Sequence, residues 1–254
     1  MIDIACGAGR RILDVYDSDF NVEHKADESP LTAADLAAHT YIVEQLQALT
    51  PDIPILSEES ATIEWETRRD WDPYWLVDPL DGTKEFVKRN GEFTVNIALI
   101  RDHAPVLGVV HVPVSGDTYC GDTQSGAFLI HEDDRTTIQV RPCKETPVVV
   151  GSRSHRGALL DEYLSRLGPH EMTPMGSSLK LCLVAAGRAD LYPRLGPTSE
   201  WDTAAAHAVV SAAGGQVVDL NGSPLRYNAK ADILNPHFFV IGDDSVDWLR
   251  PLQD

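Results

Sequence analysis

Five short apolar segments between residues 74 and 130 constrain the fold of this chain more than any other feature. They span residues 74–77, 94–100, 106–112, 118–120 and 126–130, with glycine, proline and polar residues between them. Short apolar runs at this spacing, separated by turn residues, are typical of strands that pair with their neighbours along the chain. The sequence therefore predicts an antiparallel sheet in the first half of the chain.

Around this sheet the sequence predicts helices and a second layered unit. Apolar residues at helical spacing indicate helices over residues 2–16 and from Pro30 onward, followed by a short strand at 55–56. A polar stretch, residues 131–146, is the predicted junction. Beyond it strands alternate with helices; the predicted strands are 148–150, 191–192 and two near residues 217 and 239, and the predicted helices are 158–167, 178–186 and 202–213. We expect two subdomains, residues 1–142 and 143–254, with a cleft between them.

Charge and cysteine usage limit the possible functions. The chain has 39 acidic and 21 basic residues and a net charge of -18, which argues against a broad nucleic-acid-binding surface. A phosphorylated small molecule stays possible, because bound divalent cations can reverse the local field. The four cysteines are scattered without zinc-like spacing, and no apolar run approaches the roughly 20 residues that span a bilayer. We expect a cytoplasmic protein without a transmembrane segment or a secretory signal; peripheral membrane association, a monomer and a homodimer all stay open.

An acidic turn is the most informative local motif. The apolar residues 75–77 lead directly to Asp78, and Asp81 and Gly82 follow after Pro79, where we expect the chain to turn. Two carboxylates three residues apart at the end of a strand can converge on one magnesium ion, and the glycine lets backbone N–H groups approach an anion. The alternative is a simple turn in which both aspartates only cap a loop.

Three further acidic positions could join this site. Glu58 and Glu59 follow the strand at 55–56, Asp202 heads an alanine-rich helix, and Asp35 lies early in the second helix. Each position has an ordinary alternative explanation. The two glutamates could be a solvated surface pair, Asp202 could only cap its helix, and Asp35 could be a surface acid favoured by the helix dipole.

Taken together, these segments resemble the lithium-sensitive, magnesium-dependent phosphatase superfamily, which includes inositol monophosphatases and fructose-1,6-bisphosphatases. The matching motifs are Ser-Glu-Glu at 57–59, Asp-Pro-Leu-Asp-Gly-Thr at 78–83 and Trp-Asp at 201–202, in this order. Within the superfamily the chain looks most like the 3′(2′),5′-bisphosphate nucleotidases; this closer resemblance is carried by residues 82–96, 152–155, 176–180 and 192–198. One departure is Ala206, where relatives often have glycine, and it affects only local packing.

The resemblance implies an α+β fold, a layered αβαβα sandwich with the active site between the two halves. It also implies two or three Mg²⁺ ions: the implied ligands are the carboxylates of Glu58, Asp78, Asp81 and Asp202 and the carbonyl oxygen of Leu80. Asp78 would bridge two ions. Thr83, paired with Asp35, would orient and deprotonate the attacking water, and the N–H groups of Gly82 and Thr83 would hold phosphoryl oxygens.

For the substrate, the resemblance implies 3′-phosphoadenosine 5′-phosphate, which is hydrolysed to AMP. Ser177, Lys180 and Arg194 would meet the 5′-phosphate and ribose, and His155 would lie along the adenine, although a lone histidine is often an ordinary surface residue. We interpret the three nearby cations at 84, 88 and 89 as solvated. Relatives suggest a role in sulfur assimilation, with nucleotide salvage as the alternative, and inhibition by Li⁺.

Two other functions compete with this hypothesis. One keeps the same metal centre but hydrolyses inositol monophosphate or fructose 1,6-bisphosphate. The other is an acidic cation-binding regulatory protein without catalysis. The presence of both Asp35 and Thr83 argues against the second, because a cation binder needs no water-activating pair.

Overall fold

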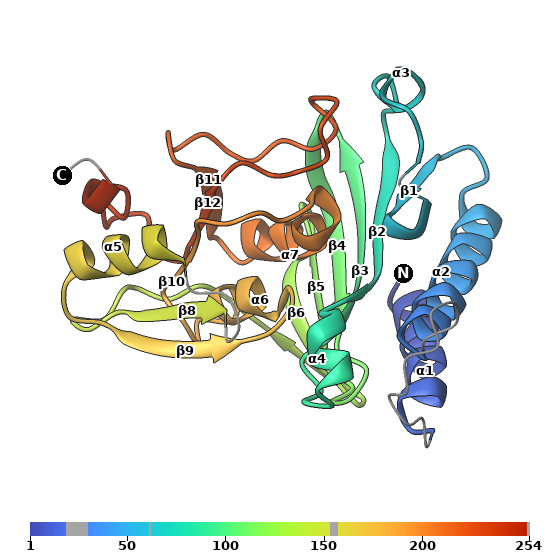
Figure 1. Ribbon diagram of the computed structural model, residues 1–254, viewed down its shortest axis with the longest axis horizontal. Coiled ribbons are helices and arrows are strands. Elements are labelled where there is room, and N and C mark those ends of the chain that lie inside the picture. Colours follow the sequence, from blue (N-terminus) through green and yellow to red (C-terminus); the bar gives the residue numbers. More distant parts are fainter. Residues whose placement is uncertain (19–29, 61, 153–156, 253–254) are drawn as a thin grey trace.

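The computed structural model describes residues 1–18, 30–60, 62–152 and 157–252, and these form five layers of helices and sheets (Figure 1). The helices α1 (Ile2–Tyr16) and α2 (Pro30–Leu49) cover the outer face of a seven-stranded sheet. Between this sheet and a five-stranded one lie α6 (Leu179–Ala185) and α7 (Glu200–Ala212), and α5 (Ala158–Leu167) covers the far side. The predicted layered αβαβα sandwich is therefore confirmed.

The seven-stranded sheet follows the order of the chain. Its strands are β1 (Ile55–Ser57), β2 (Tyr74–Asp81), β3 (Thr94–Arg101), β4 (Ala104–His111), β5 (Thr118–Asp122), β6 (Gly126–His131) and β7 (Asp134–Thr137). Only the β1–β2 pair is parallel, so the predicted antiparallel sheet is confirmed from β2 onward. The strand β7 falls in the stretch we expected to be a junction, because its four residues are all exposed and carry no apolar pattern.

The second sheet has the order β11-β12-β10-β8-β9. Its strands are β8 (Val148–Ser152), β9 (Glu171–Met175), β10 (Leu191–Arg194), β11 (Gln216–Asp219) and β12 (Phe238–Ile241). The sequence did not predict β9, an incompletely buried edge strand that contains Pro174. The division of the chain at residue 142 stays a prediction.

Short helical turns connect these layers: η1 (Glu58–Ser60), α3 (Trp65–Arg68), α4 (Thr83–Val87) and η2 (Arg250–Leu252). The structure corrects the predicted turn at Pro79. The strand β2 continues to Asp81, and its pairing with β3 is irregular between Asp78, which lies opposite Asn96, and Asp81, which lies opposite Thr94. Proline cannot donate to the sheet, which is one reason for an irregular ladder there.

The helix α7 packs unusually close to the first sheet. Its Ala204, Ala205 and Ala206 are buried, and a Cβ atom placed on Gly108 of β4 would lie 2.0 Å from the carbonyl oxygen of Ala205. Only glycine permits this approach. Alanine at position 206 fits here, since its side chain is fully buried in the core.

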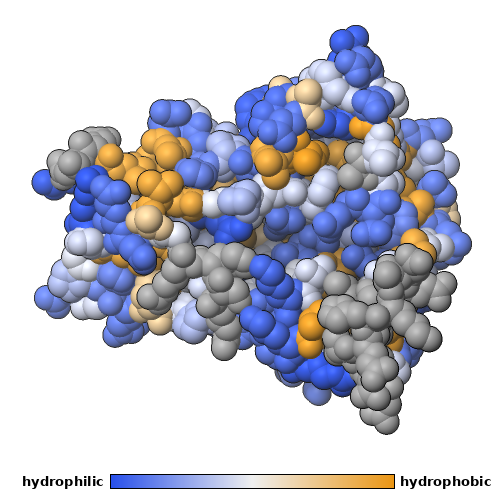
Figure 2. Space-filling model, viewed as in Figure 1, coloured by the Kyte–Doolittle hydropathy of each residue, from blue (hydrophilic) through white to orange (hydrophobic). Residues whose placement is uncertain are grey.

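The visible surface is largely polar. The face drawn in Figure 2 is mostly hydrophilic, with separate apolar patches rather than a continuous band. Among the described residues, no helix combines the length and the apolar character needed to cross a membrane.

Candidate active site

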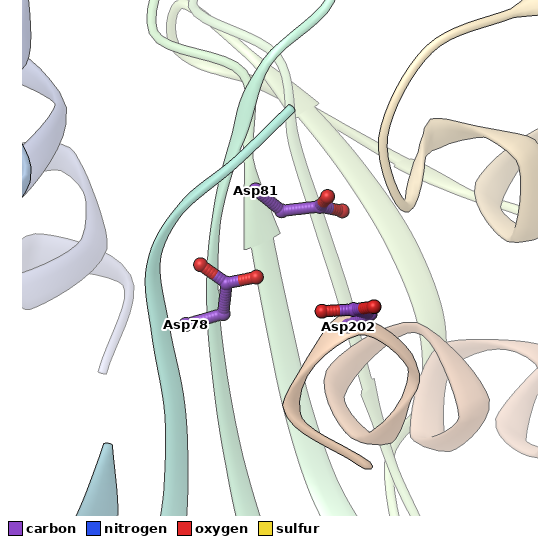
Figure 3. A group of neighbouring side chains, drawn as sticks. All are labelled: Asp78, Asp81 and Asp202. Carbon is purple, nitrogen blue, oxygen red and sulfur yellow. The ribbon is translucent and has the colours of Figure 1, made fainter. Parts of the chain in front are cut away.

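Three aspartates from distant parts of the chain meet between the two sheets. Asp78 and Asp81 come from the end of β2, and Asp202 comes from the first turn of α7. One carboxylate oxygen from each lies within 4.8 Å of the others, and Figure 3 shows the three side chains directed toward one another. The predicted convergence of these residues is therefore what the structure shows.

The irregular end of β2 orients the first two carboxylates. Asp78 Oδ1 accepts the N–H of Leu80 at 3.0 Å, so this side chain is fixed by its own strand. Gly82 has a φ of 97°, a left-handed conformation that favours glycine, and the helix α4 starts directly after it. Asp81 therefore lies at the last position of β2, directly before the chain changes direction into α4.

A buried polar network holds Asp81 from the other half of the molecule. Asp81 Oδ2 accepts the N–H of Ser178 at 2.6 Å, and Ser178 Oγ donates to Asn96 Oδ1 at 2.9 Å. The Thr94 hydroxyl also lies 2.9 Å from Ser178 Oγ. Sequence analysis missed this network, although two polar residues at alternate positions of an otherwise apolar strand, Thr94 and Asn96, were a usable signal.

Asp202 also caps the helix α7. The start of α7 is a capping box in which the N–H of Ser199 donates to Asp202 Oδ2 at 2.9 Å, while the Ser199 side chain accepts the backbone N–H of Asp202. One carboxylate oxygen is thus used by the cap, and carboxylates have lone pairs left for a cation. The two readings of this residue, helix cap and metal ligand, are compatible.

Glu58 and Asp35 adjoin the three aspartates. Glu58 lies in η1, and its side chain shares a hydrogen bond with that of Asp78. Burial raises the pKa of Glu58, and this hydrogen bond only partly offsets the increase. Asp35 is 8% exposed, its Oδ1 has no hydrogen-bond partner among the described residues, and Glu58 and Glu59 lie close enough to act on its charge. Five acidic side chains therefore share one buried region, with Glu59 at its exposed edge.

Burial and mutual repulsion make ionisation of this cluster unfavourable. Burial, with the charges of Glu59 and Glu58, raises the pKa of Asp35 to about 8. Burial, with the charge of Asp81, raises the pKa of Asp202 to about 7. The pKa of Asp78 is also raised, first by burial and then by the neighbouring carboxylates. Carboxyl groups held this close keep protons near neutral pH unless a cation compensates their charges.

The residues present fit a divalent cation. The donors are hard carboxylate oxygens, which Mg²⁺ prefers, and their spacing suits coordination on several sides of one ion. The unpartnered Oδ1 of Asp35 is a further acceptor in the same region. Leu80 lies on β2 between Asp78 and Asp81 and is fully buried, and its carbonyl oxygen stays a predicted ligand.

A cavity that includes the carboxylates of Asp81 and Asp202 also carries two cationic side chains that could pair with a phosphorylated ligand. Lys180 and Arg194 line it, as do Ser177, Gly82 and Asp202. Lys180 Nζ donates to the carbonyl oxygen of Ser177 at 2.6 Å, and Arg194 Nη2 donates to that of Pro197 at 2.6 Å. The Arg194 Nε is buried and has no hydrogen-bond partner among the described residues.

The remaining predicted residues are placed as follows. Thr83 is the first residue of α4 and is exposed; its pairing with Asp35 stays a prediction, although α2 and α4 lie close together. His155 lies outside the described residues. The cavity also includes side chains that sequence reasoning did not assign: Glu85, Ser152, Tyr192, Thr198, Thr203 and Phe238. Glu85, Ser152, Tyr192 and Thr198 fall in motifs of the resemblance, whereas Thr203 and Phe238 gave no signal of their own.

A buried carboxylate cluster opens into a cavity that also holds Lys180 and Arg194, between two sheets of a layered sandwich, and this arrangement is typical of metal-assisted enzymes that act on anionic substrates. The chain belongs to the inositol monophosphatase family, whose pattern matches residues 1–239. Enzymes of this family use divalent metal ions.

Individual relatives agree with this assignment. The 3′(2′),5′-bisphosphate nucleotidase CysQ of Escherichia coli O6:H1 is 55% identical over 246 residues, covering 94% of this chain and 99% of that protein. The crystal structure of CysQ from Bacteroides thetaiotaomicron, a bacterial member of the inositol monophosphatase family, has a TM-score of 0.87 and 44% identity, covering 95% of each chain. An inositol monophosphatase from Zymomonas mobilis, 23% identical with a TM-score of 0.83 over 99% of this chain and 95% of its own, shares the fold. The predicted resemblance is confirmed.

Proposed function

We propose that this protein is a magnesium-dependent 3′(2′),5′-bisphosphate nucleotidase that hydrolyses 3′-phosphoadenosine 5′-phosphate to AMP and phosphate. The 55% identity to a nucleotidase over nearly the whole chain favours this substrate. The observation that carries the chemistry is the meeting of Asp78, Asp81 and Asp202 beside Lys180 and Arg194.

In this proposal the acidic residues hold two or three Mg²⁺ ions. Glu58, Asp78, the carbonyl oxygen of Leu80, Asp81 and Asp202 are the proposed ligands. Bound Mg²⁺ supplies positive charge that lowers the pKa of the attacking water and stabilises the departing oxygen. Since phosphoryl transfer needs positioning and charge stabilisation more than covalent chemistry, such a site is sufficient.

The protein groups orient the reactants. Thr83 and Asp35 hold the water in line with the phosphorus atom, and Asp35 takes its proton. The N–H groups of Gly82 and Thr83 hold the phosphoryl oxygens at the start of α4. The free Oδ1 of Asp35 and the short distance between α2 and α4 support this arrangement.

The other half of the molecule recognises the rest of the substrate. Lys180 and Arg194 pair with the 5′-phosphate, with Ser177 beside them, because both cations line the cavity next to the carboxylates. An arginine with a free Nε can bind phosphate through two parallel hydrogen bonds. His155 is proposed to lie along the adenine. A cytoplasmic location and a role in sulfur assimilation stay predictions.

A substrate panel tests this function. Phosphate release from 3′-phosphoadenosine 5′-phosphate, inositol 1-phosphate and fructose 1,6-bisphosphate is measured with and without Mg²⁺, and again with added Li⁺. We expect the nucleotide to give the highest kcat/KM, a strict need for Mg²⁺, and inhibition by Li⁺. A preference for inositol 1-phosphate would overturn the substrate assignment, and Asp81→Asn, which removes a proposed ligand, is the inactive control.

A further inference from the structure

A buried arginine lies outside the carboxylate cluster and belongs to none of the motifs that predict function. Arg68 is the last residue of α3, six positions before β2 begins, and is 5% exposed. Its guanidinium lies 4.9 Å from the centre of the Trp65 ring. Burying an arginine is costly, so its partners deserve a functional explanation.

The partners of Arg68 lie on a segment about 160 residues further along the chain. Arg68 Nη1 donates to Asn228 Oδ1 and Nη2 donates to the carbonyl oxygen of Ala231. In return, Asn228 Nδ2 donates a hydrogen bond to the carbonyl oxygen of Arg68 at 2.6 Å. The planar guanidinium thus binds two acceptors at once, a geometry that lysine cannot reproduce.

Asn228, which Arg68 holds in place, also contacts the helix that carries Asp202. Its backbone has a φ of 50°, which asparagine tolerates better than most residues, and its N–H donates to Glu200 Oε2 at 2.7 Å. Glu200 is the first residue of α7, and its own N–H donates to the carbonyl oxygen of Ile233 at 2.9 Å. The first turn of α7 is therefore held by the segment that Arg68 fixes.

The connection joins the two parts of the chain that supply the carboxylates. Arg68 precedes β2, which carries Asp78 and Asp81, and Glu200 precedes Asp202 by two residues. Figure 1 shows α3 at the end of β2 that lies on the same side of the molecule as the loop after β11. Without these hydrogen bonds, repulsion among the carboxylates would push β2 and α7 apart.

We propose that Arg68 is a positioning residue for the cation site: through Asn228 and Glu200 it holds Asp202 at the distance from β2 that a divalent cation requires. The proposal rests on the proposed function in one respect, that Asp202 is a cation ligand. Its effect is on cation affinity rather than on the chemical step, since Arg68 itself lines neither the carboxylate cluster nor the cavity beside it.

The test compares Arg68→Met, which keeps much of the side-chain length but removes every donor, with Arg69→Met at the adjacent exposed arginine. Mg²⁺ binding is measured by calorimetry, and kcat is measured at saturating Mg²⁺. We expect Arg68→Met to raise the Mg²⁺ Kd about tenfold, the lower end of the loss caused by removing a partner that orients a metal ligand. We expect its kcat at saturation to stay within about threefold of wild type, Arg69→Met to match wild type, and Arg68→Lys to be intermediate.

A folded Arg68→Met protein with the wild-type Mg²⁺ Kd would overturn the proposal. If Arg68→Met does not fold, Asn228→Gly decides, because glycine accepts the same φ and removes only the bridging amide. The same rise in Kd then supports the proposal, and an unchanged Kd contradicts it. Failure of the proposed function is separate: it would show as wild-type protein that binds no Mg²⁺ or releases no phosphate from the nucleotide.

Discussion

At the scale of single residues, the site consists of buried carboxyl groups whose ionised form is unfavourable until a positive charge compensates it. The raised pKa values of Asp35, Asp78 and Asp202 all have burial as their largest cause, with neighbouring negative charge added to it. Such perturbation by burial and like charges is common at functional sites. Single substitutions can therefore separate residues that bind the cation from residues that act on the water.

Replacing Thr83 by alanine should slow catalysis without weakening cation binding. We expect kcat to fall by about 10²-fold or more, the usual contribution of a group that assists proton transfer. The Mg²⁺ Kd, measured by calorimetry, should stay the same, because Thr83 is not a proposed ligand. Thr83→Ser keeps the hydroxyl and should recover most of the rate. An unchanged kcat in Thr83→Ala would remove Thr83 from the mechanism.

Asp202→Asn should separate the cap of α7 from cation binding. The amide oxygen can still accept the Ser199 N–H, so we expect the free energy of unfolding of the metal-free protein to fall by less than about 1 kcal/mol. The Mg²⁺ Kd should rise at least about tenfold with the loss of a charged ligand. Ser199→Ala is the matched control: urea unfolding should show a loss of about 1 kcal/mol, with Mg²⁺ affinity retained. Normal Mg²⁺ binding by Asp202→Asn would contradict the ligand role.

The sequence predicted the acidic residues of the site better than the residues that hold them. Asp78, Asp81 and Asp202 were recognisable because each lies beside a strand end or a helix start within a specific motif. Arg68 was not recognisable, and Asn96 and Ser178 lay in matching motifs without an assigned role, because their roles come from hydrogen bonds to residues more than 80 positions away. Contacts of this kind depend on the packing of layers, which no local pattern describes.

At the scale of elements, periodicity predicted the long, well-buried helices and strands. The helix at Ile2–Tyr16 and that at Ala158–Leu167 have the predicted bounds. The pattern failed for β7 and β9, where exposed or half-exposed strands gain stability from ladder hydrogen bonds to a neighbour rather than from an apolar face. The continuation of β2 past Pro79 was likewise decided by pairing of Asp81 with Thr94 on β3.

The close packing of α7 on the first sheet should be sensitive to one methyl group. Gly108→Ala would place a Cβ against the backbone of Ala205, which cannot move without shifting the helix. We expect a loss of about 1–3 kcal/mol in the free energy of unfolding, the range for overpacked cores. Urea unfolding measures it, with Gly196→Ala as the control, since a Cβ there meets nothing within 4 Å. Equal stability of the two variants would show that α7 adapts easily.

At the scale of the whole molecule, the metal-free protein should lose stability as the pH rises from about 7 to 8.5. Asp35, with a folded-state pKa of about 8, and Asp202, at about 7, hold protons that they release in the unfolded state, where carboxyl pKa values are near 4. The folded state therefore binds more protons, and the free energy of unfolding decreases with pH, by about 1 kcal/mol over this window.

Urea unfolding in a chelator and in excess Mg²⁺ checks this pH dependence. In Mg²⁺ the part of the decrease that comes from Asp35 and Asp202 should disappear, because the cation favours the ionised carboxylates. A smaller part should remain from Glu200, which is not a proposed ligand and whose pKa is raised by burial to about 7. Buried His111 and His207, whose pKa values are lowered to about 4, affect stability mainly below pH 7 and do not interfere. Asp35→Asn should reduce the slope in chelator. A slope that is the same with and without Mg²⁺ would show that the carboxylates do not govern it.

The three aspartates come from β2 and from α7, which the ribosome delivers at very different times. The three aspartates are therefore brought together only in a chain that extends past residue 202 and has α7 in place. Under the proposed function, the full set of cation ligands is reached only once α7 has packed against the first sheet.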